Sequence, residues 1–264
     1  MTPPAPETAI GALVLAGARA GGDALARAEG VVSKAVIEID GRPMLARVLA
    51  ALADAGVRTP VAVLGLDEAV LAAAAGATPC RRVDSPVGAG PAASLLAALD
   101  GPVALPVLVT TCDHALLTPA MVAAFLGGAR ASGADLCVGL AERATIEAAY
   151  PMTRRTYLRL GGAELSGCNL FYLADARALR VLRFWQAAEQ DRKRPWRIAW
   201  RLGPLTALRI ILGRPGVDAV FALLSRRLGA TVAPVILPFA EAAIDVDSAG
   251  DLALVRGILA ARAA

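Results

Sequence analysis

The sequence predicts an α/β fold, a Rossmann-like open, mostly parallel twisted sheet with helices on both faces. Three observations predict it. Short, continuous apolar runs, such as residues 10–16, are typical of strands buried on both faces. Segments with apolar residues at helical spacing, such as 44–52, alternate with those runs. Glycines, such as Gly56, close several of these segments. Repeated strand–helix units of this kind form parallel sheets.

The N-terminal half contains the repeated units. Its first strand, 10–16, ends at Gly17. Further strands are expected at 61–65, 80–83, 106–112 and 134–140, and helices at 44–52, 68–75, 92–99 and 121–131. Because open sheets bind ligands at the carboxyl ends of their strands, residues that directly follow these strands are the first candidates for a site.

The pattern changes in the C-terminal half. Strands are expected at 157–160 and 170–173, as a hairpin-like excursion, and at 232–237; helices are expected at 176–190, 217–228 and 249–263. The chain shows no internal repeat and no linker-like segment. We therefore expect a single domain spanning residues 1–264, with a basic and aromatic helical insertion at about 180–230.

The composition excludes several classes of protein. The 264 residues are 56% hydrophobic and 19% charged, which is enough for one large core. Long uncharged stretches such as 101–112 and 115–129 are shorter than the roughly 18 apolar residues of a membrane-spanning helix. The Pro-rich start lacks the pattern of a signal peptide. The four cysteines form no CxxC pair, so we expect free thiols and a cytoplasmic protein.

The positive charge is concentrated in one segment. The net charge is +4, but residues 192–214 contain seven Lys or Arg and no acid, which leaves 20 basic and 23 acidic residues elsewhere. The rest of the chain is therefore mildly acidic, at −3. This distribution argues against a nucleic-acid-binding surface and directs attention to the basic segment.

A glycine-rich turn follows the first strand. It comprises residues 16–22, and Lys34 comes shortly after it. Lys34 is one of only two lysines, beside 25 arginines. Glycines let backbone N–H groups approach an anion closely, and a nearby cation neutralises phosphate charge. The pattern thus indicates a polyphosphate site, and an ordinary strand–helix turn with a surface lysine is the alternative interpretation.

Acidic residues follow two apolar segments. Asp113 ends the central strand 106–112, and Asp245 and Asp247 alternate near the last helix. Alternation predicts that Asp245 and Asp247 share one face of a strand end. Carboxylates at such positions suit Mg²⁺, which takes one or two of them together with substrate phosphates. The alternative is that these acids cap a turn or the last helix.

A second glycine pattern competes for nucleotide binding. Residues 88–93 fit GxGxxA, the dinucleotide fingerprint, and Asp113 lies 20 residues past Ala93. However, the preceding strand is weak, and Pro91 lacks the N–H that a pyrophosphate would need. An NAD-dependent oxidoreductase is therefore an alternative interpretation, which these two features disfavour.

Five motifs occur in an order that resembles a known family. They are LVLAGAR (13–19), SKA (33–35), GRPML (41–45), CDH (112–114) and IDVDS (244–248). Together they resemble the MobA-like NTP transferase family, which includes molybdenum-cofactor nucleotidyltransferases. The resemblance covers nearly the whole chain and implies a GT-A-like fold and Mg²⁺-dependent nucleotidyl transfer. The turn departs from the usual pattern at Ala18, where a second glycine is common, and at Ala20.

The resemblance implies roles for the motif residues. The triphosphate would be held by Ala16, Gly17, Ala18, Arg19 and Lys34, and the base by Pro86, Gly88, Gly90 and Ser94. Asp113 and Asp247 would bind Mg²⁺, with Asp245 as a further candidate ligand. Arg19, Lys34, Asp113 and Asp247 would be the catalytic residues.

The expected chemistry needs few residue types. In nucleotidyl transfer an acceptor oxygen attacks the α-phosphorus of an NTP, and pyrophosphate leaves. A metal, Arg19 and Lys34 would stabilise the charge of the leaving group. A phosphate acceptor is largely ionised near pH 7, since its second pKa is about 6, so no general base is needed. A chain whose only histidine is His114 agrees with this scheme.

Recognition of the acceptor needs residues outside these motifs. The candidates are Tyr150, Arg154, Arg155, Arg159 and Asn169. Clustered arginines suit a phosphate group, and a solvated basic surface is the alternative.

The segment 192–214 combines basic residues with Trp196, Trp200 and aliphatic residues. Such stretches suit anionic membrane surfaces, so a peripheral position at the inner membrane face is one expectation. Helices packed on the domain are the other.

The sequence favours a nucleotidyltransferase that uses CTP, or GTP, and a phosphorylated small molecule or lipid precursor. A molybdopterin cytidylyl- or guanylyltransferase is the alternative within this class. An NAD-dependent oxidoreductase and a non-catalytic nucleotide sensor are alternatives from other classes.

Overall fold

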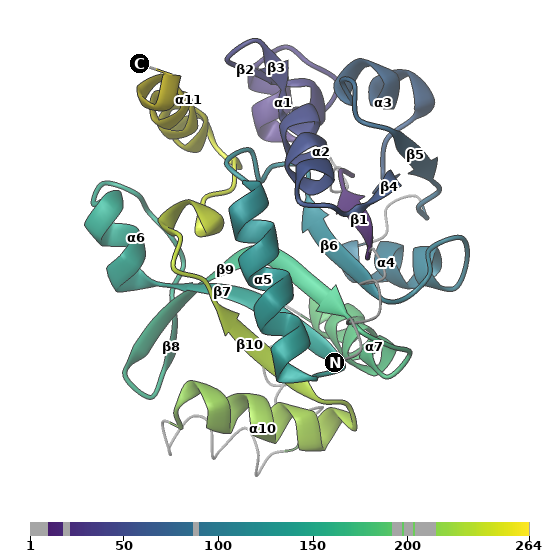
Figure 1. The fold of residues 1–264 in the computed structure, drawn as a ribbon, viewed down its shortest axis with the longest axis vertical. Coiled ribbons are helices and arrows are strands. Elements are labelled where there is room, and N and C mark those ends of the chain that lie inside the picture. The colour runs from purple at the N-terminus through teal and green to yellow at the C-terminus, as the bar shows by residue number, and fades with distance from the viewer. Residues whose placement is uncertain are drawn as a thin grey trace, which may run out of the picture.

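The computed structural model describes residues 10–17, 22–86, 90–191, 197, 203 and 215–263. In this part of the chain eight strands form one sheet (Figure 1). The strand order is β10-β7-β9-β6-β1-β4-β5, and β8 pairs with β9. The strands are β1 (Gly11–Leu15), β4 (Arg58–Leu64), β5 (Cys80–Val83), β6 (Val107–Thr111), β7 (Leu136–Glu142), β8 (Leu158–Leu160), β9 (Ala163–Leu173) and β10 (Val232–Ile236). The expected open, mostly parallel sheet is confirmed.

One long strand runs against the others. β9 lies between β6 and β7 and is antiparallel to both. It also pairs with the short β8, so the expected hairpin exists, although β9 begins at Ala163 rather than at residue 170. The two halves of the chain therefore share a single sheet.

Helices cover both faces of the sheet. The larger ones are α2 (Met44–Asp54), α3 (Glu68–Ala74), α4 (Pro91–Leu99), α5 (Pro119–Ser132), α7 (Ala178–Gln190), α10 (Val217–Leu228) and α11 (Ala249–Ala263). Alternation along β1 explains the two layers, because Ala12 and Val14 pack with α2, α3 and α5, whereas Leu13 packs with α4 and α7. Figure 1 shows α2 and α5 in front of the sheet.

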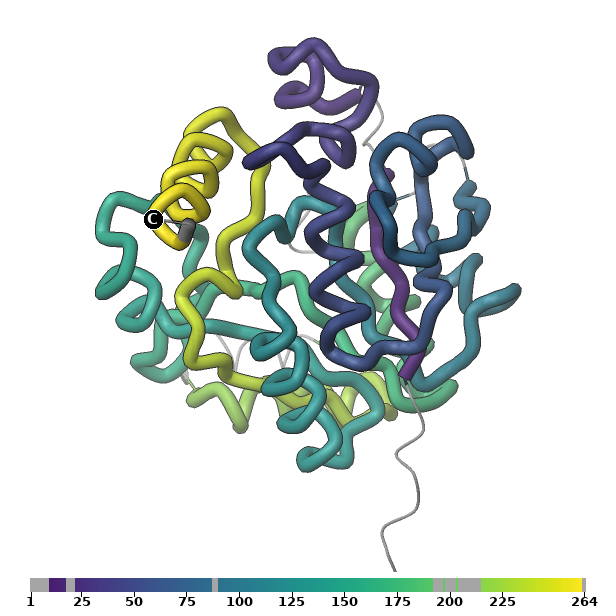
Figure 2. Tube along the Cα trace, turned by 45° about the horizontal axis from the view of Figure 1, so that its top comes forward, coloured from purple at the N-terminus to yellow at the C-terminus, as the bar shows by residue number. Residues whose placement is uncertain are grey.

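A third apolar cluster joins the two ends of the chain. Leu25, Ile37 and Met44 pack against Ile244, Val246 and Leu252. In Figure 2 the yellow segment before α11 lies beside the dark purple segment of residues 24–40. This packing brings the acidic motif of residues 244–248 to the same end of the sheet as Lys34.

Several short elements were not expected from the sequence. They are α1 (Ala24–Ala28), η1 (Lys34–Val36), the hairpin of β2 (Glu38–Ile39) and β3 (Arg42–Pro43), α6 (Arg143–Ala149) and η2 (Ala240–Ala243). The expected strand end at residues 244–247 is wrong, since this segment connects η2 to α11 without pairing in a sheet.

The basic segment lies mostly outside the described residues. Of residues 192–214, the structure describes only Arg197 and Gly203, so α7 and α10 are the described parts of the expected insertion. None of the described helices is both long enough and apolar enough to span a membrane.

Candidate functional site

The candidate site lies at the carboxyl ends of β1 and β6, which are adjacent parallel strands. Gly17 follows β1, and Asp113 follows β6. The backbone N–H of Cys112 donates to the Leu15 carbonyl at 2.9 Å, which extends the pairing to the rim of the sheet. The glycine turn and the central acid are therefore neighbours, as expected for a ligand site in an open sheet.

Lys34 contacts two acids from distant parts of the chain. Its Nζ donates to Oδ2 of Asp113, and to Oδ1 of Asp247 at 2.8 Å. Asp23, whose carboxylate caps α1, lies 3.9 Å from the same Nζ. Ser33 caps η1 through the Ala35 N–H, and this cap sets the start of the turn that presents Lys34. Lys34, Asp113 and Asp247 form what we call the lysine–carboxylate centre.

Asp113 is fixed within this centre. Its side chain is mostly buried, and its Oδ1 accepts a hydrogen bond from the Thr111 hydroxyl. Its backbone carbonyl accepts from the Val246 N–H at 3.0 Å, which connects the end of β6 to the segment that carries Asp247. The Asp247 carboxylate, in contrast, is 62% exposed. One acid of the centre is therefore mostly buried and held by several hydrogen bonds, and the other faces solvent.

The electrostatics of the centre favour a charged lysine. Burial alone would lower the pKa of Lys34, but the nearby Asp113 carboxylate and the hydrogen bonds to Asp113 and Asp247 raise it above its ordinary value. His114 differs, since burial lowers its pKa to about 4 despite the nearby Asp113. His114 is thus neutral near pH 7, and its side chain is too buried to reach a ligand.

A metal ion fits the donor chemistry of the centre. Asp113 and Asp247 both contact one Nζ atom, so their carboxylates are close enough to share a cation. Carboxylate oxygens suit Mg²⁺, which completes its shell with substrate phosphates and water. No group of three or more His, Cys, Asp or Glu that could hold a metal occurs among the described residues. Among the described residues, Asp113 and Asp247 are the two carboxylates that would hold the ion.

Asp245 belongs to a second set of contacts. Its Oδ2 accepts a hydrogen bond from the Asn169 side chain at 3.1 Å, and its Oδ1 accepts from Arg155. The expectation that Asp245 shares a strand face with Asp247 is wrong, because the intervening backbone is not a paired strand and the two side chains have different partners. Burial, followed by the charges of Asp113 and Asp247, raises the pKa of Asp245, so Asp245 lies in the electrostatic reach of the centre.

The residues expected to bind an acceptor have varied surroundings. Arg155 is 8% exposed and pairs with Asp245 and Asp251, so internal contacts occupy its guanidinium. Arg159 pairs with Glu164. The Tyr150 hydroxyl donates to Glu241 at 2.7 Å, and burial together with this bond raises the pKa of Tyr150 to about 12. Arg154 is exposed.

The segments expected to hold the nucleotide are described in part. Ala18, Arg19 and Gly88 lie outside the described residues. Gly17 lies so close to Gly65 that a Cβ on Gly65 would be 2.3 Å from the Gly17 Cα, and Gly65 has a φ of +89°. Only glycine fits there, so the end of β4 supports the turn that follows β1.

The second nucleotide segment begins a helix. Gly90 is the N-cap of α4, and the Ser94 hydroxyl lies 2.7 Å from that of Ser85. Pro86 lies just before the residues that the structure does not describe. A Cβ on Gly90 would be 2.5 Å from Oε2 of Glu189 on α7, so a carboxylate stands at the start of α4.

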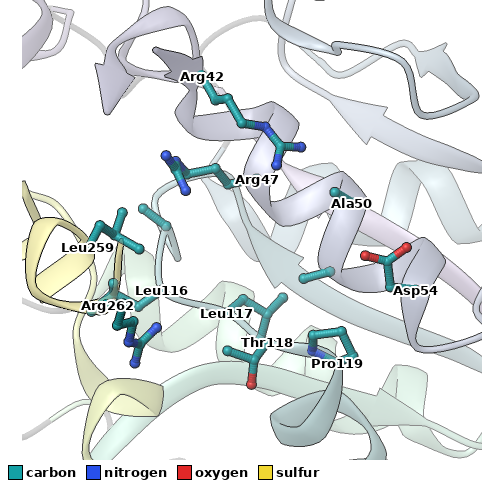
Figure 3. Close-up of a pocket in the computed structure, with 12 residues that line it drawn as sticks. Arg42, Arg47, Ala50, Asp54, Leu116, Leu117, Thr118, Pro119, Leu259 and Arg262 are labelled. Carbon is teal, nitrogen blue, oxygen red and sulfur yellow. The ribbon is translucent and has the colours of Figure 1, made fainter. Parts of the chain in front are cut away.

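A hollow of about 230 Å³ is lined by residues of α2, of the segment 115–119 and of α11 (Figure 3). Its lining includes three arginines, Arg42, Arg47 and Arg262, and apolar residues such as Leu116. Arg47 donates to the Ile39 carbonyl, and Arg262 pairs with Glu241. None of the expected site residues lines this hollow.

Comparison with known proteins identifies the family. The model of the MobA-like NTP transferase domain matches residues 12–193, which include the glycine turn, Lys34 and Asp113. The chain belongs to the MobA-like NTP transferase family. It is therefore a nucleotidyltransferase, as the resemblance implies, and the oxidoreductase interpretation loses its support. No protein of curated function matches the chain in sequence.

Solved structures similar to this family member share its fold. A hypothetical transferase from Thermus thermophilus is 32% identical, with a TM-score of 0.77 over 93% of this chain and all of the other. A nucleotidyl transferase from Methanothermobacter thermautotrophicus is 18% identical, with a TM-score of 0.57 over 97% of this chain and all of the other. A CMP:2-keto-3-deoxy-manno-octonic acid synthetase complexed with CTP is 15% identical, with a TM-score of 0.56 over 97% of this chain and all of the other.

Sequence reasoning missed three contributors to the site. Asp23 caps α1 and lies near Lys34, Thr111 donates to Asp113, and Asp251 accepts from Arg155. Asp23 follows Gly22 before a short helical run, which is a cap signal that could have been noticed. No sequence signal indicates that Arg155 faces acids about 90 residues away.

Proposed function

We propose that this family member transfers NMP from an NTP, with CTP favoured and GTP as the second choice, to a phosphorylated acceptor, using Mg²⁺ and releasing pyrophosphate. The observation that carries the proposal is the lysine–carboxylate centre, in which Lys34 contacts both Asp113 and Asp247 beside Gly17. A cation and two carboxylates at the end of a glycine turn suit a metal–polyphosphate substrate.

Each residue of the centre has a distinct role in this proposal. Asp113 and Asp247 would hold Mg²⁺, which would neutralise phosphate charge as pyrophosphate forms. Lys34 would leave the carboxylates and bind the β- or γ-phosphate. Gly17, Ala18 and Arg19 would contact the triphosphate, and Gly90 and Ser94 would lie near the base. Such placement of charge, rather than covalent catalysis, is what nucleotidyl transfer requires.

The acceptor in this proposal is a phosphate ester. Its ionised oxygen forms a bond to the α-phosphorus, and the bond from the α-phosphorus to the bridging oxygen breaks, so pyrophosphate leaves with that electron pair. No side chain has to remove a proton, which agrees with the burial of His114. Arg154 is exposed and carries the charge that a phosphate would need.

Two solved structures with this fold bear on the choice of nucleotide. One solved structure with this fold is a synthetase complexed with CTP, and another is a molybdopterin-guanine dinucleotide biosynthesis protein A from Archaeoglobus fulgidus, 13% identical with a TM-score of 0.52. A molybdopterin cytidylyl- or guanylyltransferase is accordingly the second candidate. The basic and aromatic segment 192–214 favours a lipid precursor instead.

Peripheral membrane binding follows from the same segment. The proposal places the protein in the cytoplasm, where residues 192–214 would bind anionic lipid at the inner face of the membrane. Sedimentation with anionic vesicles should weaken with salt and with Trp196→Ala and Trp200→Ala. If the wild type does not sediment with such vesicles at low salt, the membrane part of the proposal is wrong.

A screen for pyrophosphate release tests the reaction. Four NTPs are each combined with phosphorylated acceptors of several classes, including sugar phosphates, polyol phosphates and molybdopterin. Release should require a divalent cation, and Lys34→Ala and Asp113→Ala should each reduce the rate by about 100-fold or more. If the protein binds an NTP but releases no pyrophosphate with any of the acceptors, a nucleotide sensor is favoured.

A further inference from the structure

Four carboxylates and two cations lie together around the lysine–carboxylate centre. Lys34 contacts Asp113 and Asp247, whereas Arg155 contacts Asp245 and Asp251. The proposed function uses only the first set. The two acids of the second set flank Asp247 in the sequence. Asp245 precedes it by two residues, and Asp251 lies in the first turn of α11.

Arg155 grips the segment on both sides of Asp247. Nη1 donates to the Asp245 carboxylate and, at 3.4 Å, to the Asp245 backbone carbonyl, and Nη2 donates to the same carbonyl at 3.3 Å. Nη2 also donates to Oδ1 of Asp251 at 2.7 Å. The planar fork of arginine allows this simultaneous contact, which a lysine ammonium would not reproduce.

Asp251, which pairs with Arg155, also forms hydrogen bonds with Ser248, the residue that follows Asp247. Its Oδ2 accepts from the Ser248 N–H at 3.0 Å and from the Ser248 hydroxyl at 2.6 Å. The Ser248 hydroxyl in turn accepts from the Asp251 N–H at 3.2 Å, so Ser248, and not Asp247, caps α11. The Asp247 carboxylate, one residue before this cap, contacts Lys34.

Asn169 holds the other oxygen of Asp245. It lies within β9 with a φ of +49°, a left-handed conformation that asparagine tolerates better than most residues. Its amide donates to Oδ2 of Asp245 at 3.1 Å. Asp245 is therefore tied to the sheet on one side and to Arg155 on the other.

Removing Arg155 would remove the cation that contacts both Asp245 and Asp251. Asp245 is largely buried and lies near the charges of Asp113 and Asp247. An unpaired carboxylate there would repel Asp247 or pull the segment away, since a buried charge without a partner is costly. Arg155 thus opposes the separation of Asp247 from Asp113.

We propose that Arg155 is a positioning residue that holds Asp247 where it can share one divalent cation with Asp113. This inference rests on the proposed function. It also replaces the expectation that Arg155 binds the acceptor phosphate. Partners that orient metal ligands typically change metal affinity by about 10- to 100-fold when they are mutated.

Titration of the full-length protein with Mn²⁺ alone, followed by electron paramagnetic resonance, tests the inference. Arg155→Lys keeps the charge but loses the fork, and should raise the dissociation constant for Mn²⁺ about 10-fold; Arg155→Ala should raise it more. Arg177→Ala is the matched control, because Arg177 also pairs with two aspartates, Asp135 and Asp175, away from the centre. Its Mn²⁺ affinity should equal that of the wild type.

Two further measurements separate positioning from mere stability. Thermal unfolding shows whether each variant is folded. If Arg155→Ala is not folded, the Mn²⁺ affinity of Arg155→Lys decides whether Arg155 has the positioning role. Binding of CTP in EDTA should be unchanged in Arg155→Lys. A structural role alone would lower the melting temperature and leave Mn²⁺ affinity intact in the folded protein.

Failure of this inference differs from failure of the proposed function. If the wild type binds Mn²⁺ and releases pyrophosphate, but folded Arg155 variants bind Mn²⁺ equally well, the positioning role is overturned and the transfer reaction stands. If the wild type neither binds Mn²⁺ nor releases pyrophosphate, the proposed function fails and the inference fails with it.

Discussion

Removing the positive charge of Lys34 should strengthen the binding of a metal ion to the lysine–carboxylate centre. Without nucleotide, the Lys34 ammonium contacts both carboxylates that a metal would use. A metal that binds alone must therefore displace it. Lys34→Met keeps most of the length and apolar surface of the side chain and removes the competing charge.

The contacts of Lys34 set the size of the effect. A hydrogen bond between charged groups, such as that to the mostly buried Asp113, contributes about 1.5–3 kcal/mol. The pair with Asp247 adds less than about 1 kcal/mol, because that carboxylate is 62% exposed. Displacing Lys34 thus costs about 2–3 kcal/mol, or roughly 30- to 150-fold at about 1.4 kcal/mol per tenfold. Since the ammonium can keep part of these contacts, we expect at least a tenfold gain.

The assay is a Mn²⁺ titration of the nucleotide-free protein, with Lys193→Met, at the only other lysine, as the control. Lys34→Met should bind Mn²⁺ at least about tenfold more tightly than the wild type, yet lose about 100-fold in pyrophosphate release. Equal or weaker Mn²⁺ binding by Lys34→Met would refute the competition between Lys34 and a metal for the two carboxylates.

Three further changes test other parts of the structure. Gly65→Ala should lower the free energy of unfolding in urea by more than about 2 kcal/mol, because the new Cβ would overlap Gly17. The same change should raise KM for the nucleotide. A KM equal to that of the wild type would contradict the idea that Gly65 supports the glycine turn. The pKa of His114 is about 4 in the fold against 6.5 ordinarily, so its contribution to stability is complete above pH 6.5 and is lost as pH falls toward 4. In EDTA, the loss should reach about 3 kcal/mol over that range, and His114→Gln should remove it; an unchanged pH dependence in this variant would be evidence against a buried neutral histidine. Thr111→Val should cost about 1.5–3 kcal/mol of stability through the lost bond to Asp113, and an unfolding free energy equal to that of the wild type would argue against this contact.

The long elements of the fold were predictable from the sequence. Continuous runs such as 106–112 and periodic segments such as 217–228 predict β6 and α10, since several turns or a whole buried strand repeat the signal. The five residues of α1 are too few for periodicity. The antiparallel position of β9 between β6 and β7 depends on which strands pair, and local sequence does not contain that information.

The site was predictable where motifs mark it. A lone lysine after a glycine turn and an acid after a central strand indicated Lys34 and Asp113, and the structure brings them together with Asp247. The roles of Asp245 and Arg155 were not predictable, because a sequence shows charges but not their partners. In the sequence Arg155 resembles a phosphate ligand, whereas in the structure it pairs with Asp245 and Asp251.

The yield of nucleotidylated acceptor per pyrophosphate tests most directly whether the lysine–carboxylate centre performs nucleotidyl transfer. Wild type and Asp113→Asn are compared with the NTP and acceptor found by the screen, in Mg²⁺ and in EDTA. The wild type in Mg²⁺ should form one nucleotidylated acceptor for each pyrophosphate, and EDTA or Asp113→Asn should reduce both products together by about 100-fold or more. Equal product formation by folded Asp113→Asn in Mg²⁺ would contradict the claim.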